Sequence, residues 1–479
     1  MNGEYKSEYN KKSELLSLAG ILTASAVFNV IFLHTFPMVY GNDTVGRLLH
    51  NDRIFFAYWL PAFQSIIFLV SKITENLFVL RYILIVILTG AGAALYLFMK
   101  SITNHRAALY AVCLFLFSPM TVYLTLVPYQ EVLFIAFVFL SLYYFYSEPS
   151  LKHILLTSLF TGLSCLTRYE GWILSSFLCI EYIRRQKDIA VIVKGALLFF
   201  WAAALIYFSG MYTSPESNSS LLTWDAITGT PAFLWFYLPR LIVWANPVVF
   251  IIALAGVFFF RREKRSLPQG LKTFLLFVLS VVCLLLFFTS DGTRFNTRFV
   301  FLPSVALCLI GGISTSNILH TLSIVRIKKI LPLLLMIILI PFTVFMMYRV
   351  VQTVEVQTPY KIAMFLNQED VQNENVLVVG TLTFDTGGEN ENDFARIVVQ
   401  TQNGRRRIYS LGKITANVQL VAFIQENNIR YIVKLFEVKN NNMEMTEDWQ
   451  SAGFDAIRMR EIHSFPNVRI YRIDGLNPF

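Results

Sequence analysis

Charged residues are scarce in this chain, and that scarcity excludes an ordinary soluble domain. Only 15% of the 479 residues are charged, whereas soluble domains usually carry about a quarter. Hydrophobic residues make up 55% of the sequence and recur in apolar runs of roughly 20 residues, which predict a polytopic α-helical membrane protein. In such a protein an excess of lysine and arginine mainly reports topology, so the net charge of +9 does not indicate a nucleic-acid partner.

Cysteine is sparse as well, and none of the cysteines has metal-ligand spacing. This disfavours a disulfide framework or a zinc site, and we expect neither a divalent metal nor a cofactor. No small-residue cleavage site follows the first apolar run, which predicts a retained helix. The absence of a cytoplasmic nucleotide-phosphate loop disfavours a nucleotide-driven pump. The cysteines all lie in apolar stretches, at Cys113, Cys165, Cys179, Cys283 and Cys308.

Clusters of basic residues define the expected topology. They share one side if the chain crosses the membrane about eleven times, with its N-terminus in the cytoplasm and its C-terminus outside. These clusters are Lys11–Lys12, Lys100–Arg106, Arg184–Lys187, Arg261–Arg265 and Arg326–Lys329. Pro239 and Pro247 are expected to break the eighth span. Function or local pairing must explain the arginines left on the outer side, which are Arg47, Arg53, Arg168, Arg294 and Arg298.

Two segments are ambiguous by hydropathy alone. Residues Ile54–Val70 are apolar enough to span, but a crossing there would move the later basic clusters outside. We interpret this segment as interfacial or re-entrant, with Pro61 breaking it. Residues His153–Ile183 are long, but the sequence TRYEG at Thr167–Gly171 interrupts them. Two crossings here, rather than one, keep the next basic cluster on the cytoplasmic side, which favours two short helices with a charged outer turn. Such a turn lies within the membrane and is stable only inside protein or a watery cavity.

The composition changes after about residue 355. We predict a transmembrane domain at 1–354 and a small α/β domain on the outer face at 355–479, with a helix near Ala416–Asn427. The segment GRRRIYS at Gly404–Ser410 is interpreted as charged surface. The expected strands are Asn375–Gly380, Arg396–Gln400, Arg430–Phe436 and Val468–Ile473.

Polar residues on the outer side come from separate loops and are expected to meet in one cavity. The loop at 38–64, directly after the first span, is the richest of these. Arginine binds phosphate through a planar fork of donors, which makes Arg168, Arg294 and Arg298 candidate phosphate ligands. A carboxylate near the apolar boundary can act as a base, and Asp43 is the candidate. The expected cavity residues are Arg47, Asp52, Glu131, Tyr169 and Glu170.

Each candidate also has a purely structural interpretation. Asp43 is a natural cap for a short helix beginning just after it, and Glu131 for the fourth span. Arg168 and Glu170 would form an ion pair that fixes a turn. Asp52 would pair with the neighbouring arginine, and the late arginines would contact lipid headgroups.

Several short motifs occur in a telling order along the chain. An acid soon after the first span is followed by WLPAFQ, PYQE, LTRYEGW and TRFVFLP, the last opening a late span. In this order and sidedness the chain resembles the GT-C superfold over roughly Leu15–Ile340. It most resembles bacterial and archaeal members of the protein-mannosyltransferase and aminoarabinose-transferase group.

The resemblance implies roles for individual residues. The loop acid that matches Asp43 would be the catalytic base, and Arg298 or Arg294 would bind the carrier phosphate. The acid of PYQE and the LTRYEGW turn would line the cavity. The protein-mannosyltransferase subgroup has Asp-Glu where this chain has Asp43-Thr44, which argues against protein acceptors. The WWD-type signature of oligosaccharyltransferases is absent, so their metal site is not carried over.

We therefore predict an inverting, metal-independent glycosyltransferase of the cytoplasmic membrane. It would move a sugar from a polyprenyl-phosphate donor to a hydroxyl of a lipid, glycan or protein acceptor at the outer face. Two alternatives remain. A transporter or flippase of a polar lipid would carry charges near the midplane of several spans and would show repeated helix pairs. A polymerase or ligase of surface polysaccharide would also place arginines in outer loops.

Overall fold

The computed structural model describes most of the chain at the level of elements and contacts. The described residues are 2–38, 42–52, 54–55, 60–74, 76–147, 150–186, 193, 195, 197–208, 230–262, 266–288, 297–321, 325–352, 354–368, 371–379, 397–398, 401, 407–410, 417–435, 437–439, 442–444, 457–465 and 468–476.

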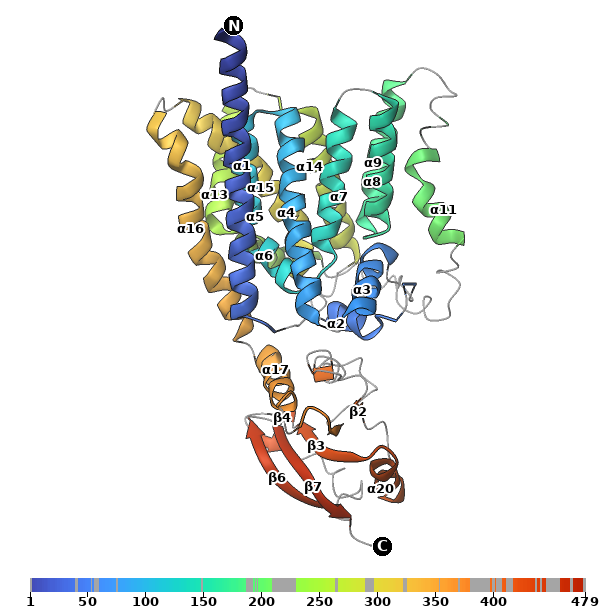
Figure 1. The fold of residues 1–479 in the computed structure, drawn as a ribbon. Coiled ribbons are helices and arrows are strands. Elements are labelled where there is room, and N and C mark those ends of the chain that lie inside the picture. Colours follow the sequence, from blue (N-terminus) through green and yellow to red (C-terminus); the bar gives the residue numbers. More distant parts are fainter. Residues whose placement is uncertain are drawn as a thin grey trace. The chain divides into compact units, whose positions relative to one another are not determined.

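The chain divides into two compact units. The first contains Met1–Thr35, Asp52–Ser71 and Phe78–Tyr348, and the second contains Phe36–Asn51, Lys72–Leu77 and Arg349–Phe479. The helices that belong mainly to the first unit (Figure 1) are α1 (Asn2–Thr35), α3 (Pro61–Ile73), α4 (Leu77–Ile102), α5 (His105–Leu116), α6 (Pro119–Leu126), α7 (Glu131–Tyr146), α8 (Leu151–Cys165), α9 (Glu170–Arg185), α11 (Trp201–Phe208), α12 (Thr230–Ala245), α13 (Pro247–Arg262), α14 (Gln269–Phe288), the 3₁₀ helix η4 (Thr297–Val300), α15 (Phe301–Thr321) and α16 (Val325–Val351).

Several helices of this unit are long and apolar enough to cross a membrane, as expected of a multi-pass membrane protein. Within the described residues four single helices meet this criterion, and up to six spans result if each bent helix pair counts as one. The four are Lys12–Thr35, Leu77–Ile102, Arg298–Leu319 and Leu333–Val351. The larger expected number of about eleven remains a prediction.

Proline positions explain where several helices begin or bend. Pro61 begins α3 rather than breaking it, because a first-turn residue needs no intrahelical N–H bond. Pro119 begins α6, and the α5–α6 pair bends by 54° there. The α12–α13 pair bends by 102° at Asn246–Pro247, where Asn246 has a φ of 80°. The expected break at Pro247 is therefore present, whereas Pro239 lies inside α12.

The expected interruption of His153–Ile183 is confirmed. Helix α8 ends at Cys165 and α9 begins at Glu170, so the TRYEG sequence forms the turn between two short helices. Helices α7, α8 and α9 pack against one another in chain order. This arrangement brings the start of α7 and the turn between α8 and α9 to the same end of the helix bundle.

Helices α5 and α15 pack with their backbones in close approach. A Cβ atom at Gly312 of α15 would lie 2.6 Å from Ala111 N and 2.7 Å from Ala107 O of α5. The small residues on both helices permit this contact, as is typical of helix interfaces in membranes. Buried Cys113 and Cys308 lie on the same two helices. The interface therefore depends on the missing side chain of Gly312.

The second unit is built around a mixed sheet of five strands in the order β2-β1-β3-β7-β6. Strands β1, β2 and β3 are parallel, whereas β7 pairs antiparallel with β3 and β6. One face packs on α17 and the other on α20. The unit's elements are α2 (Asn42–Leu49), α17 (Val354–Leu366), β1 (Asn375–Val379), β2 (Ile408–Ser410), α20 (Asn417–Glu426), β3 (Ile429–Leu435), β4 (Glu437–Lys439), β5 (Asn442–Glu444), β6 (Ile457–Phe465) and β7 (Val468–Leu476).

Two expectations for this unit are wrong. Arg407 of the GRRRIYS segment is only 4% exposed, and its guanidinium donates to the carbonyl oxygens of Leu366, Val371 and Glu374 at 2.8 to 3.2 Å. Charge alone suggested surface, but this arginine donates to backbone carbonyl groups at the end of α17 and in the turn that follows it. Ile397 and Val398 are helical rather than part of a strand, and their side chains pack in the core beside α17.

We predict that Gly312→Ala separates α5 from α15 and lowers the melting temperature of the full-length protein by several degrees. The new methyl group meets backbone atoms, which cannot move aside without displacing a helix. Melting in detergent micelles, followed by intrinsic fluorescence, measures the effect. Gly90→Ala in α4 is the matched control, because a Cβ there meets no atom within 4 Å, and alanine favours the helix. Equal melting of the two variants would contradict this account of the interface.

Candidate functional site

A short turn delivers Glu131 to the start of α7. Helix α6 ends at Leu126, and the N–H of Tyr129 donates to the carbonyl oxygens of Val127 and Leu124. Arg81 of α4 is 1% exposed, and its Nε donates to Leu126 O at 2.8 Å. A buried guanidinium therefore holds the end of α6 from which this turn departs. Glu131 follows as the first residue of α7, with 1% of its surface exposed.

The turn between α8 and α9 places Arg168 and Glu170 beside that helix start. The N–H groups of Thr167 and Arg168 both donate to Ser164 O, and the N–H of Gly171 donates to Arg168 O. A Cβ at Gly171 would lie 2.5 Å from the backbone of Cys165 and of Ser164. Only glycine allows the start of α9 to approach the end of α8 this closely, which makes the tight turn between them possible.

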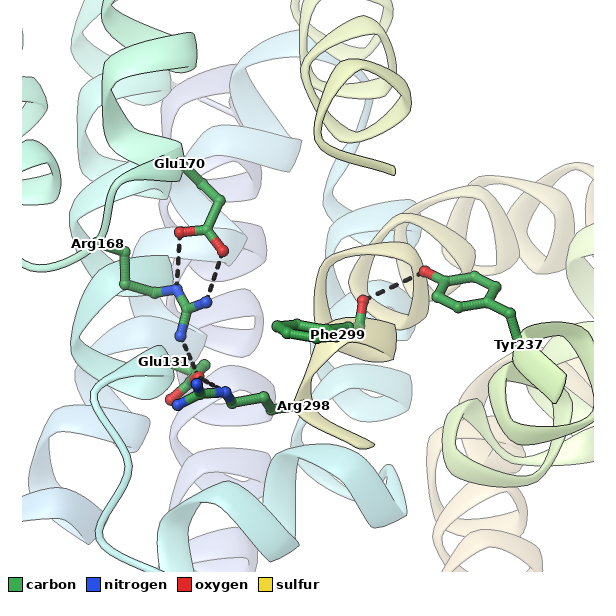
Figure 2. Close-up of polar contacts among 6 residues, drawn as sticks. All are labelled: Glu131, Arg168, Glu170, Tyr237, Arg298 and Phe299. Atoms are coloured by element: carbon green, nitrogen blue, oxygen red, sulfur yellow. Dashed lines mark hydrogen bonds and ion pairs between the residues drawn. The ribbon is translucent and has the colours of Figure 1, made fainter. Parts of the chain in front are cut away.

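Arg168 bridges the buried carboxylate of Glu131 and the partly buried carboxylate of Glu170 (Figure 2). Its Nε donates to Glu170 Oε2 at 3.0 Å and its Nη2 to Glu170 Oε1 at 2.5 Å, in a bidentate pair. Its Nη1 donates to Glu131 Oε1. All three nitrogen atoms of the guanidinium thus contact a carboxylate. The expected ion pair of Arg168 with Glu170 is present, and Arg168 also connects the start of α9 to the start of α7 through Glu131.

Arg298 enters the same cluster from η4. Its Nε lies 4.0 Å from Glu131 Oε1, a longer separation than in the Arg168 pairs. Its guanidinium carbon lies 5.9 Å from the ring centroid of Tyr129 and 5.8 Å from that of Phe299, both within cation–π range. Tyr237 of α12 donates its hydroxyl to Phe299 O at 3.2 Å and so holds η4 in place (Figure 2).

The cluster contains equal numbers of opposite charges and one unsatisfied acceptor. Two glutamates and two arginines give it no net formal charge. Glu131 Oε2 is buried and accepts no hydrogen bond from any described residue. Leaving a buried carboxylate oxygen without a donor is costly. The arrangement can therefore accept a further donor at Glu131 and can present Arg298 to an anion.

The predicted site residues of the first outer loop lie in α2 and in the short segment after it. Asp43 lies in α2, and its side chain is outside the described residues. Arg47 of the same helix is 4% exposed, and Asp52 is exposed. Helix α2 belongs to the second unit, whereas Asp52 begins a segment of the first. Two further expected residues, Arg53 and Arg294, fall outside the described residues.

Of the remaining predicted residues, the structure brings together Glu131, Arg168, Glu170 and Arg298. Tyr169 lies on the same turn and is 44% exposed. Among the described residues no three histidine, cysteine or acidic side chains are grouped as metal ligands.

Sequence reasoning missed Arg81 and the aromatic residues around Arg298. A signal for Arg81 was available, because a charged residue inside an apolar span is costly and usually functional. The aromatic contacts had no such signal, since phenylalanine and tyrosine are abundant throughout the chain. Their role depends on α6, η4 and α12 meeting in space.

Comparison with known proteins gives the fold. No protein-family model matches the chain, and no curated protein sequence matches it. Solved structures do match. ArnT from Cupriavidus metallidurans bound to undecaprenyl phosphate aligns with a TM-score of 0.58 at 10% identity, over 96% of this chain and 98% of ArnT. The archaeal oligosaccharyltransferase AglB from Archaeoglobus fulgidus, in complex with an inhibitory peptide and a dolichol-phosphate, gives 0.51 at 12% identity, over 87% of this chain and 69% of AglB.

A third similar structure is the arabinofuranosyltransferase AftD from Mycobacteria. Its TM-score is 0.50 at 11% identity, over 96% of this chain and 40% of AftD. All three are GT-C structures. At these identities the likeness establishes the fold and not the activity, and it confirms that this chain has the GT-C-like fold that its motifs predicted.

We predict that Arg168→Met destabilises the protein by about 3–5 kcal/mol, because it leaves buried Glu131 and partly buried Glu170 without their shared counter-ion. Adding Glu170→Met should recover part of the loss, since Glu131 then keeps Arg298 and the cluster is neutral again. Thermal unfolding of both variants in micelles measures this.

Arg460→Met is the matched control for this pair. Arg460 and Asp474 form an exposed ion pair at 3.7 Å, and exposed pairs contribute about 0–1 kcal/mol. If the double variant is less stable than Arg168→Met alone, the charge-balance explanation is wrong.

Proposed function

We propose, on the premise that this chain has the GT-C-like fold, that it transfers a sugar from a polyprenyl-phosphate donor to an acceptor hydroxyl. The solved structures of similar fold support this, because ArnT was captured with undecaprenyl phosphate and AglB with a dolichol-phosphate. The carrying observation is the cluster in which buried Glu131 lies between Arg168 and Arg298. A phosphate-linked substrate is anionic and needs cationic side chains to bind it. The arginines of this cluster supply them beside membrane helices.

Arg298 is the proposed ligand of the carrier phosphate. Its contact with Glu131 is 4.0 Å long, and the rings of Tyr129 and Phe299 flank its guanidinium. A phosphate can therefore compete with Glu131 for the donors of Arg298, because this carboxylate is not in a short ion pair with it. Arg168 is different, because Glu131 and Glu170 already take all three of its nitrogen atoms. We assign Arg168 the role of holding Glu131, and Arg294 stays a second candidate for the phosphate.

Asp43 is the proposed base. In this mechanism the acceptor hydroxyl oxygen attacks the anomeric carbon while Asp43 takes the hydroxyl proton. The bond between the anomeric carbon and the phosphate oxygen breaks, and its electron pair leaves with the carrier phosphate. Arg298 stabilises the charge that develops there. Attack opposite the leaving group inverts the anomeric configuration.

The proposed setting is the cytoplasmic membrane, with the N-terminus in the cytoplasm and the reaction at the outer face. The basic clusters expected on one side support this orientation. The acceptor would be a glycan, lipid or protein hydroxyl, and Arg47, Asp52 and Tyr169 stay candidates for contacting it. A transporter would need charges near the midplane of several spans, whereas the ion pairs here lie at helix starts.

We predict that Asp43→Asn lowers the turnover number by about 10²- to 10⁴-fold, because the amide cannot accept the proton. The assay follows product formation from purified protein and synthetic polyprenyl-phosphate sugars by mass spectrometry. Asp474→Asn, at an exposed residue of β7, is the matched control and should leave turnover unchanged. Wild-type turnover in a folded Asp43→Asn variant would refute the base assignment.

We also predict that Arg298→Lys weakens donor use by about 10- to 100-fold in kcat/KM, since lysine lacks the planar fork that binds phosphate. The same substitution at exposed Arg184 on α9 serves as control. If no polyprenyl-phosphate sugar yields product with the wild-type protein, the proposed function itself fails.

A further inference from the structure

A cavity lies at the other end of α7 from the ion cluster. It has a volume of about 570 Å³ and is lined by Ser101, Tyr143, Tyr146, Ser147 and His153. Helix α7 has 16 residues, which puts its two ends roughly 22 Å apart. The cavity is therefore separate from the proposed transferase site, and no step of that reaction uses it.

Every residue that lines this cavity carries a hydrogen-bonding group. Ser101 lies at the end of α4, the two tyrosines on the last turn of α7, Ser147 at its C-cap and His153 on the first turn of α8. Within the described residues the lining contains no carboxylate. A cavity of this kind takes a polar ligand, and its size is that of a small-molecule site.

The orientation of the hydroxyl groups decides which polar ligand fits. Ser101 donates its proton to Phe98 O at 2.7 Å, and Ser147 donates to Tyr143 O at 2.6 Å. Each hydroxyl has one proton, so both oxygens face the ligand as acceptors only. The hydroxyl of Tyr143 makes no hydrogen bond to another described residue. The ligand must therefore supply several O–H or N–H donors.

The described charges near the cavity disfavour a cationic ligand. Two carboxylates in this part of the described chain are already paired, Glu14 with Lys100 at 2.8 Å and Glu181 with Arg185 at 3.1 Å. Lys152 is exposed on the same helix turn as His153. The hydroxyl groups of a polyol are donors without positive charge. The basic residues near the cavity favour a polyol with an anionic group attached.

The walls of the cavity are held in place by packing. Tyr146 shares a hydrogen bond with Thr273 of α14 at 2.5 Å, and a Cβ at Gly270 would lie 3.1 Å from its ring. Arg185 lies over the same ring at 5.1 Å. The ring of His153 lies 5.6 Å from that of Tyr144. The acceptor oxygens are thus presented by rigid helix ends.

We propose that this cavity binds the phosphate-linked polyol headgroup of a membrane lipid. The polyol hydroxyls donate to Ser101 and Ser147 and exchange a hydrogen bond with Tyr143, while the phosphate faces Lys152 and His153. The position at the end of membrane helices favours a lipid over a soluble molecule, because headgroups lie at that depth.

The test is native mass spectrometry of the full-length protein released from micelles that contain one added lipid. Phosphatidylglycerol carries both the phosphate and the polyol, whereas phosphatidylcholine carries the phosphate with a cation and no hydroxyl. We expect the wild-type protein to retain phosphatidylglycerol at least about tenfold better. Equal retention of the two lipids would overturn the proposal.

Two variants locate the binding. Tyr143→Phe keeps the ring and removes the hydroxyl, and it should weaken retention of phosphatidylglycerol by about three- to tenfold. Ser101→Phe fills the cavity and should abolish the preference. The control is Tyr348→Phe on α16, at an exposed tyrosine, and it should retain the lipid as the wild type does. Unchanged retention by both cavity variants would place the lipid elsewhere and refute the assignment.

A competition experiment with a soluble compound distinguishes a lipid headgroup from a free polyol phosphate as the ligand. Glycerol 1-phosphate carries the same groups without acyl chains. We expect it not to displace phosphatidylglycerol at equal concentration. Displacement at equal concentration would make the ligand a free polyol phosphate and would overturn the lipid part of the proposal. None of these measurements depends on glycosyl transfer.

Discussion

One buried guanidinium connects the helix starts that form the candidate site. Arg168 contacts Glu170 on its own turn and Glu131 on the start of another helix. Burying such charges is expensive, so this arrangement contributes little net stability and a great deal of specificity. Misplacing either helix start would leave a carboxylate without a counter-ion. The charges therefore fix where α7 and α9 begin relative to each other.

Close backbone contacts make this charge arrangement possible. Gly171 lets the start of α9 pack onto the end of α8, and Gly312 lets α15 approach α5. Helix α15 follows η4 directly, so the position of α15 also sets that of Arg298. Arg81 adds a third constraint by holding the end of α6. Each constraint acts on backbone, which is stiffer than a side chain and transmits position over a distance.

The two ends of α7 present opposite chemistry. At its start, paired charges are buried and one carboxylate oxygen lacks a donor. At its end, hydroxyl groups line a cavity, and those of Ser101 and Ser147 already donate their protons to backbone carbonyl groups three or four residues earlier. The first arrangement suits a charged reacting group and the second suits recognition of hydroxyls. Both arrangements are formed by residues within about one turn of a helix terminus, where side chains can reach beyond the hydrocarbon core of the membrane.

The sequence by itself determined the membrane class, the GT-C-like fold and the charged turn at Arg168–Glu170. Hydrophobic runs and the order of the motifs depend on local composition, which needs no tertiary contact to be visible. The burial of Arg407 and the helical state of Ile397 were not predictable in this way, because carbonyl acceptors and core neighbours come from distant segments. Tertiary structure alone decided that Glu131, Arg168 and Arg298 meet and that Tyr129 and Phe299 flank the arginine. Those contacts join residues up to 169 positions apart, taking 129 from 298, and only the packing of whole helices can bring such residues together.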